Sequence, residues 1–198
     1  MSDTRKSECS RKTNETDVAV SVELASCGSV NIASGVPFLD HMLSSFARHG
    51  RFGLSVVCKG DTHIDDHHSV EDIGICLGSA VSSALGDKKG ICRFGEAVIP
   101  MDDALALASV DLSGRGHFAY KGTELRGYIG RYSEELTVEF LRAFCVNGGM
   151  NLHLQILDGS NRHHIHEAAF KAVGIALYKA VLIDPLLGGG ILSTKGVI

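Results

Sequence analysis

The chain carries the pattern His-His-x-x-Glu twice, and this repetition restricts the folds that it can adopt. The copies occupy residues 67–71 and 163–167, an offset of 96 (163 minus 67). The strand-like stretches before them, 50–56 and 148–154, match at an offset of 98, so the copies differ by a loop length. Self-similarity at a fixed spacing indicates a duplicated structural unit. We therefore expect two halves, 1–90 and 91–198, that meet near the glycines at 86–90 and form one compact, single-function domain.

Each half shows the same order of strand and helix signals. Alternating apolar residues predict half-buried strands, whereas apolar residues spaced by three and four predict helices. In the first half we expect strands at 18–24, 30–33 and 52–58, and helices at 37–49 and from about 66. In the second half the expected strands include 104–112 and 117–121, and the helices 133–146 and 161–181. The unit is thus β-β-(β)-α-β-α, and two such α+β units can bury their helices by packing one helix layer on the other.

Bulk properties exclude several classes of protein. The net charge of -4 argues against a nucleic-acid binder. No apolar run reaches the length of about 18 residues that a membrane span needs. The polar stretch 1–11 lacks the apolar centre of an export signal, so we expect a cytoplasmic protein. The six cysteines show no regular spacing, which favours reduced thiols over disulfides or a cysteine-bound zinc.

The repeated motif predicts a metal centre. Adjacent helical residues point about 100° apart, so the two histidines of a copy diverge and suit two ions better than one. Imidazole and carboxylate are ligands for Mn²⁺, Fe²⁺ or Zn²⁺. Four protein ligands on each octahedral ion would leave about two positions open for substrate or water. His41 lies on the polar side of the expected helix 37–49, and the repeat pairs it with Glu139 in the second half. The eight candidate ligands are His41, His67, His68, Glu71, Glu139, His163, His164 and Glu167.

The same residues also permit interpretations other than metal binding. A polar capping cluster is disfavoured because a positive charge at a helix start opposes the helix dipole. Asp66 and Asp72 flank the first copy, and either could orient a metal-bound imidazole or act as a cap or a solvated charge. The remaining candidates of this type are expected to be plain surface histidines: His63, His117, His153 and His166.

A second group of residues can bind an anion. Arginine grips phosphate with two hydrogen bonds, and lysine acts as a point charge. Lys171 lies one turn beyond Glu167 on the same helix face. The other candidates stand near turns and in the glycine-rich tail: Arg93, Arg115, Ser193, Thr194 and Lys195.

Six ordered motifs resemble the imidazoleglycerol-phosphate dehydratase family over nearly the whole chain. They are Arg-Lys-Thr-Asn-Glu-Thr (11–16), Phe-Leu-Asp-His-Met-Leu (38–43), Asp-Asp-His-His-Ser-Val-Glu-Asp (65–72), Asp-Leu-Ser-Gly-Arg (111–115), Asn-Arg-His-His-Ile-His-Glu-Ala-Ala-Phe-Lys-Ala (161–172) and Ser-Thr-Lys-Gly (193–196). Many members carry His at the position of Glu139. The tail also lacks the Pro that often precedes Ser-Thr-Lys.

The resemblance implies an activity and an assembly. The activity is the step of histidine biosynthesis that dehydrates imidazole glycerol phosphate to imidazole acetol phosphate, with two Mn²⁺ ions in each active site. The assembly has twenty-four identical subunits, with active sites formed between subunits. The implied fold encloses four helices between two sheets, as in the second domain of ribosomal protein S5.

The resemblance also implies roles for individual residues. Glu15 would transfer protons, and Glu71 and Glu167 would act beside it as catalytic carboxylates. The substrate would be held by Glu15, His41, His49, His67, Glu71, Arg93, Arg115, His163, Lys171, Ser193, Thr194 and Lys195.

Two rival functions are a dinuclear phosphoester hydrolase and a non-catalytic metal-storage or assembly module.

Overall fold

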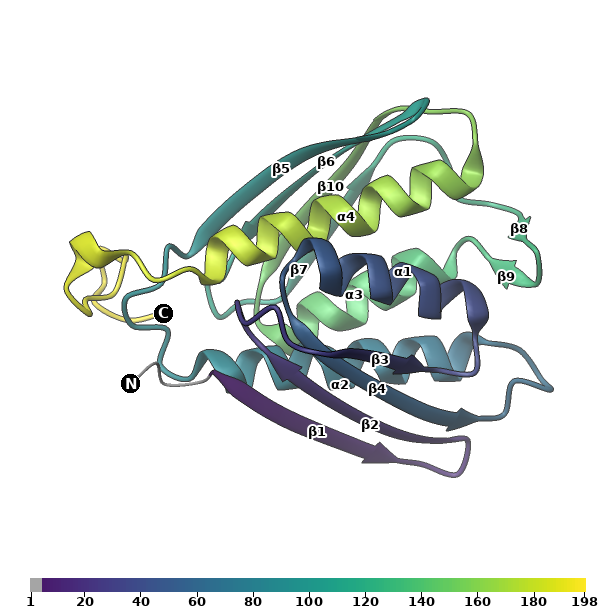
Figure 1. The fold of residues 1–198 in the computed structure, drawn as a ribbon, viewed down its shortest axis with the longest axis horizontal. Helices are drawn as coiled ribbons and strands as arrows, with labels where there is room; N and C mark the ends of the chain where they lie inside the picture. Colours follow the sequence, from purple (N-terminus) through teal and green to yellow (C-terminus); the bar gives the residue numbers. More distant parts are fainter. Residues whose placement is uncertain (1–4) are drawn as a thin grey trace.

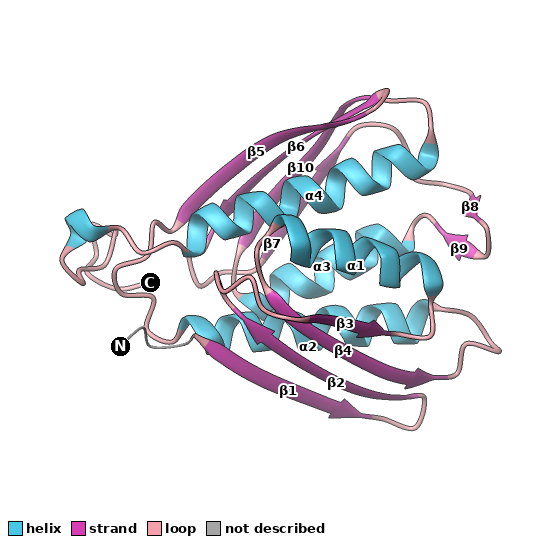
Figure 2. Ribbon diagram, in the orientation of Figure 1, coloured by secondary structure: helices cyan, strands magenta, loops and turns pink. Residues whose placement is uncertain are grey.

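Two four-stranded sheets enclose a layer of four helices in the computed structural model, which describes residues 5–198 (Figures 1 and 2). The first sheet has the order β1-β2-β4-β3, and the second has the order β5-β6-β10-β7. The first comprises β1 (Lys6–Lys12), β2 (Thr16–Glu23), β3 (Val30–Ala33) and β4 (Gly53–Gly60). The second comprises β5 (Phe94–Met101), β6 (Ala104–Asp111), β7 (His117–Lys121) and β10 (Asn151–Asp158). The helices are α1 (Pro37–His49), α2 (His67–Leu85), α3 (Leu136–Gly148) and α4 (Arg162–Val181).

The predicted duplication is confirmed by strand order and direction. In each sheet the last strand, β3 or β7, runs parallel to its neighbour, β4 or β10, and the other pairs are antiparallel. The elements α1, β3 and β7 have the predicted bounds. Both sheets turn one face to the helices, where alternate residues of β2 and β6 are buried.

Two parts of the prediction need correction or completion. The third helix begins at Leu136 rather than 133, because Tyr132 and Ser133 belong to the short strand β9 (Tyr132–Ser133), which pairs with β8 (Tyr128–Ile129). The edge strands β1 and β5 were not located from the sequence. In β1 the sequence Lys-Ser-Glu-Cys-Ser-Arg-Lys has no apolar alternation, since this edge strand has little to bury.

The helices of the two halves pack against each other as predicted. Helix α2 lies against α3, and α1 lies against α4. The helix α2 covers β1 and β2, and α4 covers β5 and β6. This arrangement places the starts of α2 and α4, and with them both motif copies, at one end of the molecule (Figure 1). The short helix η1 (Pro185–Leu187) and the C-terminal tail lie at the opposite end.

Other expectations concern the cysteines and the chain ends. All six cysteines are free thiols, and Cys58, Cys76 and Cys145 are buried. Within the part of the chain that the structure describes, no helix combines the length and the apolar character that crossing a membrane requires. Residues 1–4 of the polar stretch 1–11 lie outside the described residues.

Candidate metal and anion sites

Both motif copies begin a helix whose first amides are held by a nearby polar side chain. The Asp65 carboxylate accepts a hydrogen bond from the His67 amide at 2.8 Å. The Asn161 side chain accepts one from the His164 amide at 3.3 Å. Such bonds satisfy backbone donors that the helix itself leaves free. The two pairs of histidines are therefore carried on well-defined first turns.

The two histidines of each copy have nearly perpendicular ring planes and face different partners. The ring centroids of His67 and His68 are 6.3 Å apart, with an interplanar angle of 84°. The values for His163 and His164 are 6.3 Å and 83°. The two copies thus present the same divergent geometry at equivalent places in the fold.

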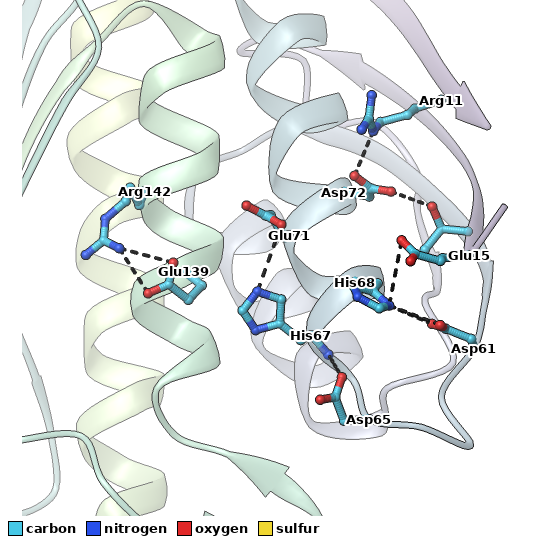
Figure 3. Close-up of polar contacts among 11 residues, drawn as sticks. Arg11, Glu15, Asp61, Asp65, His67, His68, Glu71, Asp72, Glu139 and Arg142 are labelled. Atoms are coloured by element: carbon cyan, nitrogen blue, oxygen red, sulfur yellow. Dashed lines mark hydrogen bonds and ion pairs between the residues drawn. The ribbon is translucent and has the colours of Figure 1, made fainter. Parts of the chain in front are cut away.

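The first histidine of each copy lies beside its own glutamate. On α4, His163 Nε2 is 3.3 Å from Glu167 Oε2, and His41 Nε2 of α1 approaches the same oxygen at 3.4 Å. One ligand atom from each of these three residues lies within 4.8 Å of the others, close enough to share a metal ion. On α2, His67 Nε2 is 3.9 Å from Glu71 Oε2 (Figure 3).

The second histidine of each copy turns to an aspartate from a loop. His68 Nδ1 is 3.0 Å from Asp61 Oδ2, and His164 Nδ1 is 2.7 Å from Asp103 Oδ1. The hydrogen bond to Asp61 raises the pKa of His68. A carboxylate on Nδ1 fixes the ring and leaves Nε2 as the nitrogen that can bind a metal. Sequence reasoning missed both aspartates: Asp61 lies in the loop seven residues before His68, and Asp103 is brought to His164 from 61 residues away by the fold.

The aspartates that flank the first copy have other partners. Within residues 5–198, neither the Asp66 nor the Asp72 side chain forms a hydrogen bond or an ion pair with a motif histidine. Asp66 Oδ1 accepts a hydrogen bond from Arg131 at 2.8 Å. Asp72 accepts one from Arg11 Nε at 2.7 Å and another from the Thr16 hydroxyl (Figure 3). Asp72 therefore fastens the β1–β2 hairpin to α2.

That hairpin carries Glu15 to the first motif copy. The Glu15 amide donates a hydrogen bond to the Thr13 hydroxyl at 3.0 Å, which shapes the turn. Glu15 Oε2 lies 3.9 Å from His68 Nδ1, and the side chain is half exposed (Figure 3). The predicted proton-transfer residue is thus next to a predicted metal ligand.

The carboxylate of Glu139 is paired with an arginine of its own helix. It lies on α3, across from His67 and Glu71 on α2 (Figure 3). Its two oxygens accept hydrogen bonds from Arg142 Nη1 at 3.0 and 3.1 Å. The repeat predicts this place for Glu139, since α3 packs on α2 as α1 packs on α4.

Lys171 and His49 lie further along the packed helices α4 and α1 than Glu167 and His41. Lys171 Nζ is 2.8 Å from Glu167 Oε1. Burial acts to raise the pKa of Glu167, but the hydrogen bond and charge of Lys171 outweigh it and hold that pKa below its usual value. Burial, together with the charge of Lys171, lowers the pKa of His49. Lys171 therefore lies with the metal candidates and not with the other anion candidates.

The other predicted anion ligands meet in one cavity of about 560 Å³. Arg93 Nε is 2.7 Å from Asp111 Oδ1, and Arg93 Nη1 donates a hydrogen bond to the Leu192 carbonyl at 2.6 Å, so Arg93 ties the tail to β6. The candidates that line the cavity are Arg93, Arg115, Ser193, Thr194 and Lys195. Whether they bind phosphate stays a prediction.

The surface histidines were predicted correctly with one exception. His63, His117 and His153 are exposed. His166 is buried, and its Nδ1 is 2.9 Å from the Thr137 hydroxyl. The expectation for His166 was wrong because it lies on the inner face of α4, against Phe38 and Tyr132.

Comparisons with known proteins identify relatives of the chain. A family model described as imidazoleglycerol-phosphate dehydratase matches residues 34–177. An imidazoleglycerol-phosphate dehydratase from Geobacillus thermodenitrificans is 50% identical over 194 residues, which cover 98% of this chain and 99% of that protein. The relative from Desulforamulus reducens, with the same name, is 51% identical and covers 98% of each chain.

Solved structures show the same similarity. The crystal structure of the Pyrococcus furiosus enzyme in complex with (S)-C348 superimposes with a TM-score of 0.81 at 35% identity, covering 96% of this chain and 99% of the other. The Staphylococcus aureus imidazoleglycerol-phosphate dehydratase gives 0.79 at 34% identity, covering 90% and 99%.

Proposed function

Since the chain belongs to the imidazoleglycerol-phosphate dehydratase family, we propose that its two motif copies hold two Mn²⁺ ions in each active site. The enzyme is a hydro-lyase of histidine biosynthesis, which removes water from imidazole glycerol phosphate to give imidazole acetol phosphate. The proton that must leave is on a carbon with no adjacent carbonyl, so it is not acidic. Its removal therefore needs groups beyond the carbon chain of the substrate.

One observation carries the metal proposal. The two copies repeat the same divergence of histidine rings, 84° and 83°, although loops of different length precede them. The donor set fits Mn²⁺, which accepts imidazole and carboxylate ligands. Asp61 and Asp103 hold one histidine of each pair in the manner that is typical of metal-bound imidazoles. The proposed ligands are the eight candidates named from the sequence, Glu139 included.

The residues of the chain then have distinct tasks. Bound Mn²⁺ would act as a Lewis acid toward the imidazole of the substrate. Glu15, half exposed beside His68, would move a proton at the substrate carbon. Glu71 and Glu167, each beside the first histidine of its own copy, would act as further catalytic carboxylates. We expect His41, His49 and Lys171 to contact the substrate as well.

The phosphate would bind in the cavity of Arg93, Arg115 and the tail residues. The tail that lines this cavity lies at the end of the molecule opposite the starts of α2 and α4 (Figure 1). A single substrate molecule is too small to span the length of α4, a helix of 20 residues, or about 30 Å. This separation supports active sites formed between subunits, in the predicted assembly of twenty-four chains. A cytoplasmic location remains a prediction.

Metal removal tests the proposal. The protein, stripped of metal by a chelator and assayed with imidazole glycerol phosphate, should form no ketone product, and added Mn²⁺ should restore turnover. Full activity after verified metal removal would contradict the proposal. Release of inorganic phosphate without ketone would instead indicate a phosphoester hydrolase. Metal binding with no effect of Arg115→Ala or Lys171→Ala on ligand affinity would point to a storage or assembly module.

A further inference from the structure

One segment departs from the duplication. In the first half, residues 34–36 join β3 to α1. In the second half, the equivalent β7 and α3 are joined by residues 122–135, which form the β8–β9 hairpin and its flanks. We call residues 122–135 the insertion. The duplication alone does not account for a long segment that only one of the two repeats contains.

The insertion is bound to the start of α2. Arg131 Nη2 is 2.8 Å from Asp66 Oδ1 and 3.3 Å from the Gly35 carbonyl oxygen. Asp66 directly precedes the first histidine of the first motif copy and is buried. The Arg131 side chain is 56% exposed, so this ion pair is partly open to solvent.

The insertion is also bound to the start of α4. Glu134 accepts hydrogen bonds from Arg162 Nε at 2.6 Å and from Arg162 Nη2 at 2.7 Å. The Glu134 side chain is 1% exposed, so this two-bond ion pair is closed to solvent on the glutamate side. Arg162 directly precedes the first histidine of the second copy. It is the repeat equivalent of Asp66, at the same offset of 96 (162 minus 66).

Between these two ion pairs the insertion is fixed in the core. Tyr132 is fully buried, and its ring lies 4.9 Å from that of Phe38. Phe38 in turn contacts His163 edge-on at 5.4 Å between centroids. The Tyr132 hydroxyl and the Thr137 hydroxyl share a hydrogen bond of 3.0 Å. The hairpin therefore cannot shift without disturbing the surroundings of His163.

We propose that the insertion is a clamp that fixes the starts of α2 and α4 relative to each other, with Arg131 and Glu134 as its positioning residues. Opposite charges at equivalent places, Asp66 and Arg162, are held by one short segment of the chain. The clamp fixes the positions of the two motif copies before any ligand binds. This inference rests on the proposed metal-binding function.

The two sides of the clamp differ in strength. Removing one partner of a buried ion pair strongly destabilises a protein, whereas an exposed pair contributes little to stability. Asp66 is buried, but its partner Arg131 is 56% exposed, so water can reach Asp66 where the guanidinium is removed. Arg131→Gln should thus loosen the start of α2 and leave the fold intact, while Glu134→Gln, which removes a buried carboxylate, risks unfolding. The matched control is Arg126→Gln, since Arg126 lies in the same insertion, is well exposed, and pairs with Glu124 at 2.8 Å.

The experiment has two readouts on the full-length protein. In metal-free protein, hydrogen–deuterium exchange of peptides covering residues 62–71 should be faster for Arg131→Gln and Asp66→Asn, and unchanged for Arg126→Gln. In titrations with Mn²⁺, the same two variants should bind one of two ions about two- to fivefold more weakly, as expected for a partly exposed ion pair. The double variant should bind about as weakly as Arg131→Gln alone, because Arg131→Gln already removes the contact that Asp66→Asn affects.

The outcomes separate this inference from the function on which it rests. Exchange and Mn²⁺ affinity equal to wild type in Arg131→Gln would overturn the clamp while leaving the metal proposal intact. Wild-type protein that binds no Mn²⁺ would overturn the metal proposal, and the exchange data would still decide whether the insertion holds the start of α2. Equal effects of Arg126→Gln and Arg131→Gln would also refute the clamp.

Discussion

At the scale of single residues, the two histidines of each motif copy have different neighbours. The first lies beside its own glutamate, and on α4 also near His41. The second is held at Nδ1 by a loop aspartate, Asp61 or Asp103. The backbone amide of Asn161, with further hydrogen bonds from His164 and Ser160, holds the pKa of Asp103 well below its usual value. The aspartate is therefore ionised and can fix the ring throughout the neutral range.

Removing one of these aspartates should weaken metal binding without changing a metal ligand. We expect Asp61→Asn to lower Mn²⁺ affinity at one site by about 10- to 100-fold, the usual effect of losing a partner that orients a metal-bound histidine. The affinity can be measured by calorimetric titration of metal-free protein. Asp87→Asn is the control, since Asp87 is exposed and pairs with Lys89. Unaltered affinity in Asp61→Asn would show that Asp61 does not orient His68.

At the scale of elements, two equivalent glycines let the helix layers approach each other. Gly78 on α2 and Gly174 on α4 differ by the motif offset of 96 (174 minus 78). A Cβ atom at Gly78 would lie 2.4 Å from the Phe144 carbonyl oxygen of α3. One at Gly174 would lie 2.5 Å from the Phe46 carbonyl oxygen of α1. The backbone is a rigid neighbour, so the close helix contacts α2–α3 and α1–α4 depend on the missing side chain.

Gly174→Ala should therefore destabilise the protein, although alanine stabilises an isolated helix by about 1 kcal/mol relative to glycine. Overpacking a close contact typically costs about 1–3 kcal/mol. Urea denaturation followed by circular dichroism should show a lower midpoint for Gly174→Ala and for Gly78→Ala. Ser83→Ala, on the exposed side of α2, should leave the midpoint almost unchanged. A midpoint for Gly174→Ala at or above the wild-type value would contradict the packing argument.

At the scale of the whole molecule, the two predicted parts of the active site lie far apart. The turn between β1 and β2 and the starts of α2 and α4 are at one end of the helix layer, and the C-terminal tail is at the other (Figure 1). The tail shares its cavity with Arg115. A substrate that needs both must bind where two chains meet. If both parts contact the substrate, as we propose, a single chain would hold no complete site and activity would require assembly.

Mixed assemblies should test this arrangement. Glu15→Gln lacks the proposed proton-transfer group, and Arg115→Ala lacks an anion ligand, so each pure variant should have very low activity. If one site combines the motif end of one subunit with the anion cavity of another, co-assembled variants should contain some intact sites and regain activity. Mixing the two variants without subunit exchange is the control. Inactive assemblies, shown by mass spectrometry to contain both variants, would place each site within one chain.

The sequence by itself determined the duplication, the bounds of α1, β3 and β7, and the divergence of each histidine pair. These features depend on residues that are close in the sequence, where the period of a helix or strand decides which way a side chain points. Polar edge strands such as β1 carry no such period, which is why they were missed.

The tertiary structure alone decided which distant residues meet. It placed Asp61 and Asp103 on the second histidines, buried His166 against the first half, and gathered Arg93, Arg115 and the tail in one cavity. It also bound the insertion to both motif copies through Asp66 and Arg162. Apart from Asp61, which lies only seven residues before His68, these contacts join segments that are brought together by the packing of two sheets around four helices, and no local pattern records that packing.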